Sequence, residues 1–144
     1  MIGLFSIICI IFLSCAAQGP ASGGPKDVNG PVIVAVSPDD RSVDINLETK
    51  ISFEFDEMVN PISIKSSISI LNFEDYIVKT NRKKVHIEPK TTWPKDQVIE
   101  VNISRRIRDY QNNTMPQSYQ YVFSTGKKIP EGSIIGKLEN FNPE

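Results

Sequence analysis

The chain has 144 residues, of which 40% are hydrophobic, and it carries a formal net charge of -1. This length accommodates one domain of ordinary size with short flanking segments. A nucleic-acid partner is not expected, because phosphate binding requires a clustered excess of lysine and arginine. Two short basic clusters, at 82–84 and 105–108, are interpreted as solvated strand ends.

Residues 1–14 form an uninterrupted apolar run. The run is too short for a permanent transmembrane helix, which needs about 20 residues, and it is typical of the apolar region of a secretion signal. Both cysteines of the chain, Cys9 and Cys15, lie within this run or at its edge. The rest of the chain can therefore form neither a disulfide nor a zinc site built from cysteine.

The segment Leu13-Ser14-Cys15-Ala16-Ala17 resembles the lipobox of bacterial lipoproteins. The resemblance implies that residues 1–14 are a cleaved lipoprotein signal peptide and that Cys15 is the acylated first residue of the mature chain. Acyl chains would hold the protein on a membrane without spanning it. Two alternatives remain open: an ordinary signal peptide cleaved near Ala16 or Ala17, and a buried first strand of a cytosolic protein.

Residues 15–30 are predicted to be a flexible tether, because Gln18 to Gly30 are rich in glycine and proline and show no periodicity. In lipoproteins of this type an acidic stretch after the cysteine can direct export to the cell surface. Ala16-Ala17-Gln18 contains no acidic residue. We expect the anchor to lie in the outer membrane, and the absence of an acidic stretch favours its periplasmic face over the cell surface.

Residues 31–126 contain the strand patterns. Residues 31–38 are rich in β-branched side chains and bounded by prolines, as expected of a first edge strand. A turn is expected at 39–42, and the alternation of residues 43–47 leads into the clearest strand, in which Ile51, Phe53 and Phe55 alternate with polar residues. The dipeptide Asn60-Pro61 ends that strand.

The remaining predicted elements are short. A connection or a single helical turn follows Pro61, and further strands are expected at 67–71, 76–78, 85–87, 98–103 and 119–125. The tripeptide Asn81-Arg82-Lys83 predicts a hairpin turn. About seven strands, spaced by roughly 8 to 15 residues and without an amphipathic helix, indicate an all-β sandwich.

Residues 127–144 are predicted to be a linker followed by one strand at 133–139. This strand either adds to the edge of the sandwich or opens a truncated second domain. We favour the second interpretation, because Pro130 and Gly132 separate the strand from the sandwich.

Four segments in this order resemble the bacterial Ig-like domains of S-layer and surface proteins: 31–38, 51–59, 107–112 and 121–126. Together with Gly-Gly-Pro-Lys-Asp at 23–27, they resemble the N-terminal part of a Bacteroidetes-type lipoprotein. The resemblance implies an Ig-like antiparallel β-sandwich, without catalysis, that serves as a structural spacer or adhesion module. The alternatives are a carbohydrate- or protein-binding receptor domain and an envelope enzyme. Expected partners are the membrane and envelope proteins or glycans.

One candidate ligand site follows from this fold. The loop after the second strand and the loop before the last strand lie at the same end of an Ig-like sandwich, so Asp56, Glu57, Asp109 and Asn112 are expected to converge. Such oxygen ligands suit calcium. The interpretation favoured over calcium is that Asp109 and Asn112 cap their own turn by hydrogen bonds from side chain to backbone. Glycosidase-like use of the carboxylates is disfavoured, because no cleft is predicted.

Trp93 and Tyr110 are candidates for an aromatic binding surface, but core or edge positions are the favoured interpretation. The only histidine, His86, alternates with Val85 and Ile87 and is predicted to face solvent rather than to act in catalysis. No cofactor is predicted, and calcium at the loop carboxylates is kept only as the alternative.

Overall fold

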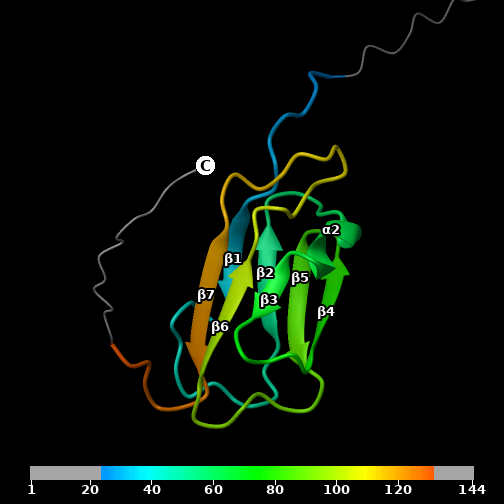
Figure 1. Ribbon diagram of the computed structural model, residues 1–144. Coiled ribbons are helices and arrows are strands. Elements are labelled where there is room, and N and C mark those ends of the chain that lie inside the picture. Colours follow the sequence, from blue (N-terminus) through cyan, green and yellow to red (C-terminus); the bar gives the residue numbers. More distant parts are fainter. Residues whose placement is uncertain (1–23, 132–144) are drawn as a thin grey trace, which may run out of the picture.

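The computed structural model describes residues 24–131 (Figure 1). They form seven strands and one short helix: β1 (Ile33–Ser37), β2 (Ile51–Phe55), α2 (Pro61–Lys65), β3 (Ile68–Ile70), β4 (Tyr76–Asn81), β5 (Lys84–Pro89), β6 (Val98–Ile103) and β7 (Tyr119–Ser124). The predictions made for residues 1–23, including Cys15, and for the strand at 133–139 lie outside the described residues.

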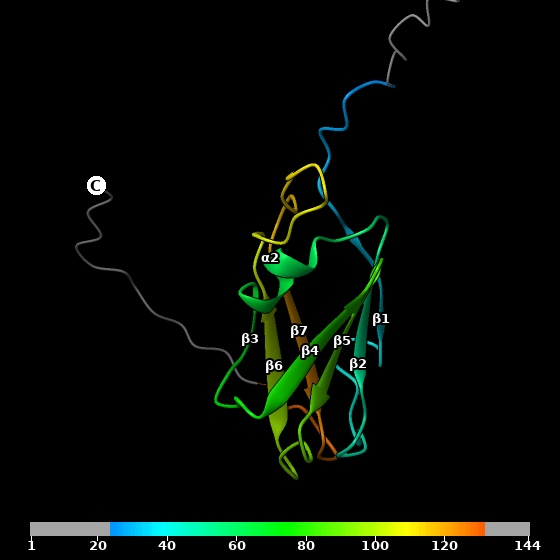
Figure 2. The same ribbon diagram turned by 90° about the vertical axis from the view of Figure 1, so that its right-hand side faces the viewer.

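The strands form two antiparallel sheets that pack face to face (Figure 2). The strand order is β1-β2-β5-β4 in one sheet and β3-β6-β7 in the other. In Figure 2, β3 and β6 lie to the left, and β1 and β2 lie to the right. The predicted all-β, Ig-like sandwich is confirmed, and β1 is an edge strand as its prolines indicated.

The core arises from alternation within each strand. Ile51, Phe53 and Phe55 are buried, and the register places Phe53 opposite Val85 and Ile51 opposite Ile87 in β5. Because successive side chains of a strand point to opposite faces, this register puts the apolar residues of both strands on one face. Buried side chains of the facing sheet complete the core: Ile68, Ile70, Ile99, Val101, Ile103, Tyr121 and Phe123.

The helix α2 is the single helical turn that the sequence allowed after Pro61. Its N-cap is Asn60, whose Oδ1 accepts a hydrogen bond from the Ile62 N–H at 3.0 Å. Proline is well tolerated in the first turn, where its missing N–H would have no helical partner. Among the described residues, no helix is long and apolar enough to cross a bilayer.

The alternating segment 43–47, which leads toward β2, is not itself a strand. After β1 the chain crosses to the other sheet, where the Arg41 N–H donates to the Val122 carbonyl at 2.7 Å and the Ser124 N–H donates to the Ser42 carbonyl at 2.9 Å. Arg41 and Asp44 both have positive φ, at 63° and 54°, which prevents a regular strand. The segment instead covers part of the free edge of β7.

The chain enters and leaves the sandwich at opposite ends. Residues 24–32 lie at the end that is uppermost in Figure 1, and the chain leaves β7 at the lower end. At the upper end Asn113 Nδ2 donates to the Asp27 carbonyl, and at the lower end the Asp44 N–H donates to the Gly126 carbonyl at 2.9 Å. The segments by which the chain enters and leaves the domain are therefore separated by the length of the sandwich.

The outer face of the four-stranded sheet carries ion pairs. Glu88 on β5 accepts from Lys50 at 2.8 Å and is also paired with Lys79 on β4. Hydrogen bonds from Lys50 and Lys79 lower the pKa of Glu88 to about 2. His86 lies half-buried on this face, two residues before Glu88, with its side chain on the side away from the core as predicted.

Replacement of Glu88 by glutamine is expected to lower the free energy of unfolding at pH 6. A folded-state pKa below the unfolded value means that the carboxylate contributes stability above about pH 4.5, and this contribution is lost as the pH falls toward 2. Urea denaturation at pH 6 and pH 3 should show the difference from wild type shrinking at the lower pH. Glu54→Gln is the matched control, because Glu54 forms one more exposed pair, with Lys84. An equal effect of Glu88→Gln at both pH values would contradict the ion-pair explanation.

Candidate functional site

Three carboxylates from distant segments meet at the upper end of the sandwich. Asp27 precedes β1, Glu57 follows β2, and Asp109 lies in the connection between β6 and β7. Carboxylate oxygens of these three residues all lie within 4.8 Å of one another. A bridge between Val59 and Asp109 holds the loops after β2 and β6 side by side.

Asp109 is fully buried and is held by Asn113. The Asn113 N–H donates to Asp109 Oδ1 at 2.8 Å, and Asn113 Nδ2 donates to Asp109 Oδ2 at 2.7 Å. The Asp109 N–H donates in turn to the Asn113 carbonyl at 3.1 Å. A buried carboxylate is costly unless hydrogen bonds replace its hydration, and these bonds supply that compensation from within the loop.

Glu57 is half-buried beside this carboxylate. Its pKa is raised by burial and then by the negative charges of Asp109, Asp27 and Asp56, while the Lys83 ammonium acts in the opposite direction. Lys83 Nζ donates to the Asp56 carbonyl at 2.6 Å. The cluster thus holds more negative charge than its neighbours balance, and either a proton on Glu57 or a cation would relieve the repulsion.

Of the four residues predicted to converge, the structure brings together Glu57 and Asp109. Asp56 points elsewhere: its Oδ1 accepts from the Val32 N–H at 2.8 Å, which joins the start of β1 to the end of β2. Asn112 is exposed and has a φ of 70°, so it lets the loop turn without joining the cluster. The side-chain role in the turn that the sequence assigned to Asn112 belongs to Asn113.

The third carboxylate, Asp27, was missed by the sequence analysis, because it lies in the segment predicted to be a tether. Asn113 Nδ2 donates to the Asp27 carbonyl at 3.3 Å. Nearby, Gly30 approaches the Thr114 carbonyl so closely that a Cβ at this position would overlap it. Residues 27–30 therefore pack against the loop that carries Asp109, and no local sequence pattern indicated this contact.

The chemistry of the cluster is that of an oxygen-only donor set. Calcium takes six to eight oxygen ligands at about 2.3–2.6 Å, and carboxylates are its usual protein ligands. The hydrogen bonds between Asp109 and Asn113 match the competing interpretation, in which the loop is capped internally. Calcium binding stays a prediction.

The variant Glu57→Gln can distinguish calcium binding by the cluster from a loop that is only capped internally. A raised carboxyl pKa means that Glu57 favours the folded state below its unfolded pKa, near 4.5, and that this benefit is lost as the pH rises through the folded pKa. Without divalent ions, Glu57→Gln should therefore raise Tm at pH 7 and leave it nearly unchanged at pH 4. Thermal unfolding in the presence of a chelator measures this, with Glu74→Gln at the far end of the domain as the control.

The same melts test calcium. If the cluster binds the ion, millimolar calcium should raise the Tm of the wild type by mass action and leave that of Glu57→Gln nearly unchanged. An identical Tm of the wild type with and without calcium would contradict the calcium prediction and leave the cluster as an internally capped loop.

The predicted aromatic binding surface is wrong for Trp93. Its side chain is 1% exposed and lies in the core, and its Nε1 donates to the Thr49 carbonyl at 2.7 Å. Tyr110 is 60% exposed and lies next to Asp109 in the connection that follows β6, whereas Trp93 lies in the connection that precedes β6, at the other end of that strand. The two rings therefore cannot form one surface.

The fold and the arrangement of these loops define an Ig-like β-sandwich. Residues 27–125, more than half of the chain, match the model of the bacterial Ig-like domain, and the chain belongs to this family. Its general role is therefore that of a structural or interaction module.

A search of solved structures found, among others, an L,D-transpeptidase from Mycobacterium smegmatis, at 16% sequence identity and a TM-score of 0.49. The alignment covers 70% of this chain and 41% of that protein, so the chain spans less than half of its length. A search of curated proteins found no match.

Proposed function

We propose that this protein is a lipid-anchored, non-catalytic module of the bacterial cell envelope that acts as a spacer and displays its C-terminal part away from the membrane. The observation that carries the proposal is the placement of the two connections at opposite ends of the sandwich (Figure 1). A module whose connections lie at one end would fold back toward its anchor, whereas this one extends the chain.

The proposed lipid anchor rests on the sequence. Cys15 resembles a lipidated residue, and the predicted tether leads to the upper end, where its last residues, 27–30, pack against the sandwich. Six-residue strands such as β6 and β7 run for about 20 Å at 3.3–3.4 Å per residue. The sandwich would thus hold its far end at least that distance from the tether.

A fluorescence measurement tests the spacer role. A fluorescent protein is placed after Glu144, and energy transfer to a dye in the membrane is compared between the full chain and a chain lacking residues 31–126. Deletion of the sandwich should increase the transfer strongly, because energy transfer falls steeply with distance. Tyr110→Ala, an exposed change within the sandwich, is the control and should leave the transfer unchanged. Equal transfer with and without the sandwich would contradict the proposal.

The competing function, a receptor domain, is not supported at the aromatic surface first assigned to it, because Trp93 is in the core. If the module also binds a ligand, the residues must come from elsewhere on the domain.

A further inference from the structure

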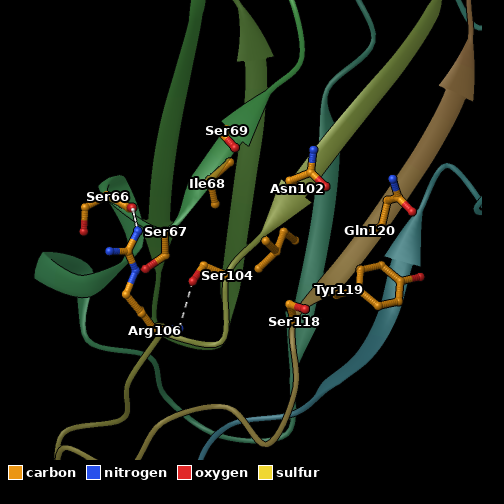
Figure 3. A pocket seen from close by; sticks show the side chains of 11 residues that line it. Ser66, Ser67, Ile68, Ser69, Asn102, Ser104, Arg106, Ser118, Tyr119 and Gln120 are labelled. Atoms are coloured by element: carbon orange, nitrogen blue, oxygen red, sulfur yellow. Dashed lines mark hydrogen bonds between the residues drawn. The ribbon is translucent and has the colours of Figure 1, made fainter. Parts of the chain in front are cut away.

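A polar hollow of about 530 Å³ lies on the outer face of the three-stranded sheet, beside the C-terminal end of α2 (Figure 3). The register of the strands builds its floor: Ser69 of β3 lies opposite Asn102 of β6, and Asn102 lies opposite Gln120 of β7. Their neighbours along each strand are buried in the core, so this row points outward. Figure 3 shows Asn102 and Gln120 side by side.

The side chains around this row are almost all uncharged. Several serines line the hollow, including Ser104 and Ser118, and the only charged side chain among the lining residues is Arg106. The Nη2 of Arg106 donates to the Ser66 carbonyl at 3.3 Å, and its backbone N–H donates to Ser104 Oγ at 3.3 Å. A guanidinium carries five N–H donors in a planar fork, so most of them remain available to a ligand.

The outer faces of the two sheets differ in how their polar side chains are paired. The four-stranded sheet satisfies its outward side chains with ion pairs, such as Glu54 with Lys84 at 3.1 Å. In the row of the hollow, Asn102 donates to Glu100 at 3.0 Å, while Ser69 and Gln120 make no side-chain hydrogen bond to another residue of the 24–131 segment. The residues that line the hollow therefore offer hydroxyl and amide groups together with one positive charge, while the Glu100 carboxylate on the same face lies outside this lining and is bonded to Asn102.

We infer that the hollow binds an acidic sugar. The hydroxyls of a sugar ring both donate and accept hydrogen bonds, as do the hydroxyl and amide groups of Ser69, Asn102 and Gln120. A sugar carboxylate matches the fork of Arg106, which can bind it through two parallel hydrogen bonds. The volume lies within the roughly 300–1,000 Å³ of ordinary small-molecule sites. A bare anion would use Arg106 but leave the polar row without a partner.

The isolated domain is suited to the test. Every buried core residue lies between Ile51 and Phe123, and the family match ends at residue 125. A chain of residues 24–131 therefore contains the complete core. Because this chain lacks Cys15, the result does not depend on the lipid anchor or on the spacer role.

The probe is the trimer of galacturonic acid, titrated into the labelled domain and followed by the NMR shifts of backbone amides. We expect saturable shifts at Ser69, Asn102 and Gln120, and an affinity at least tenfold higher than for the neutral galactose trimer. Arg106→Gln should lower the affinity at least tenfold, and Asn102→Ala should also weaken binding. Arg108→Gln removes the same charge from an exposed side chain outside the hollow and should leave binding unchanged.

Three results would overturn the inference. The first is the absence of saturable shifts at millimolar trimer. The second is an equal loss of affinity in Arg106→Gln and Arg108→Gln, which indicates attraction to net charge alone. The third is inorganic phosphate shifting the same amides with the same affinity, which identifies a bare anion as a sufficient ligand. Circular dichroism of each variant checks that the fold is retained.

Discussion

Replacement of Cys15 by alanine is expected to move the protein from the membrane fraction to the soluble fraction. Acyl chains provide the whole of the proposed attachment, and stable anchoring by lipid requires more than one chain. Without the thiol, no thioether-linked lipid can form. The full chain is expressed in a bacterium that processes lipoproteins, and intact-mass spectrometry locates the mature N-terminus and its added mass.

Cys9→Ala is the matched control for this experiment. Cys9 is the other cysteine of the chain and lies in the predicted signal peptide, so its replacement should change neither the location nor the mature mass. An unlipidated wild-type chain beginning near Ala16 would indicate plain secretion instead. Wild-type protein that retains Met1 in the soluble cell interior would contradict both forms of export.

Replacement of Trp93 by alanine is expected to remove a large part of the stability of the domain. The ring packs against Phe73 at a centroid distance of 5.2 Å and against Phe123 at 5.3 Å. Truncating a buried tryptophan typically costs about 3–5 kcal/mol, and a domain has only about 5–15 kcal/mol in total. The change also leaves the Thr49 carbonyl without its 2.7 Å donor.

Urea denaturation of Trp93→Ala, Trp93→Phe and Tyr110→Ala measures these contributions. Trp93→Phe keeps part of the packing and loses the hydrogen bond, so its free energy of unfolding should fall between those of the wild type and Trp93→Ala. Tyr110 is 60% exposed, and its replacement should change the free energy of unfolding by about 0.5 kcal/mol or less. If Trp93→Ala were as mild as Tyr110→Ala, the core position of Trp93 would be wrong.

Only part of the candidate carboxylate site could be predicted from the sequence. Glu57 and Asp109 could be paired because the topology of an Ig-like sandwich places their loops at one end. Asp27 could not be added, since its position depends on contacts of residues 27–30 with Asn113 and Thr114. A glycine-rich segment carries no sequence pattern that predicts such a contact.

The sequence by itself determined the strands, because their signal is local. The alternation of Ile51, Phe53 and Phe55 records which face of the strand is buried, and neighbours two residues apart are enough to show it. The same alternation occurs at 43–47 without forming a strand, because Asp44 has a positive φ and the segment hydrogen-bonds to the edge of β7.

Only the tertiary structure decided which side chains share a surface. Trp93 became a core residue through the packing of one sheet on the other, and Ser69, Asn102 and Gln120 became neighbours through the register of three strands. Both depend on contacts between residues far apart in the chain. Register and packing are set by the burial of the whole core, so no single segment of the sequence contains them.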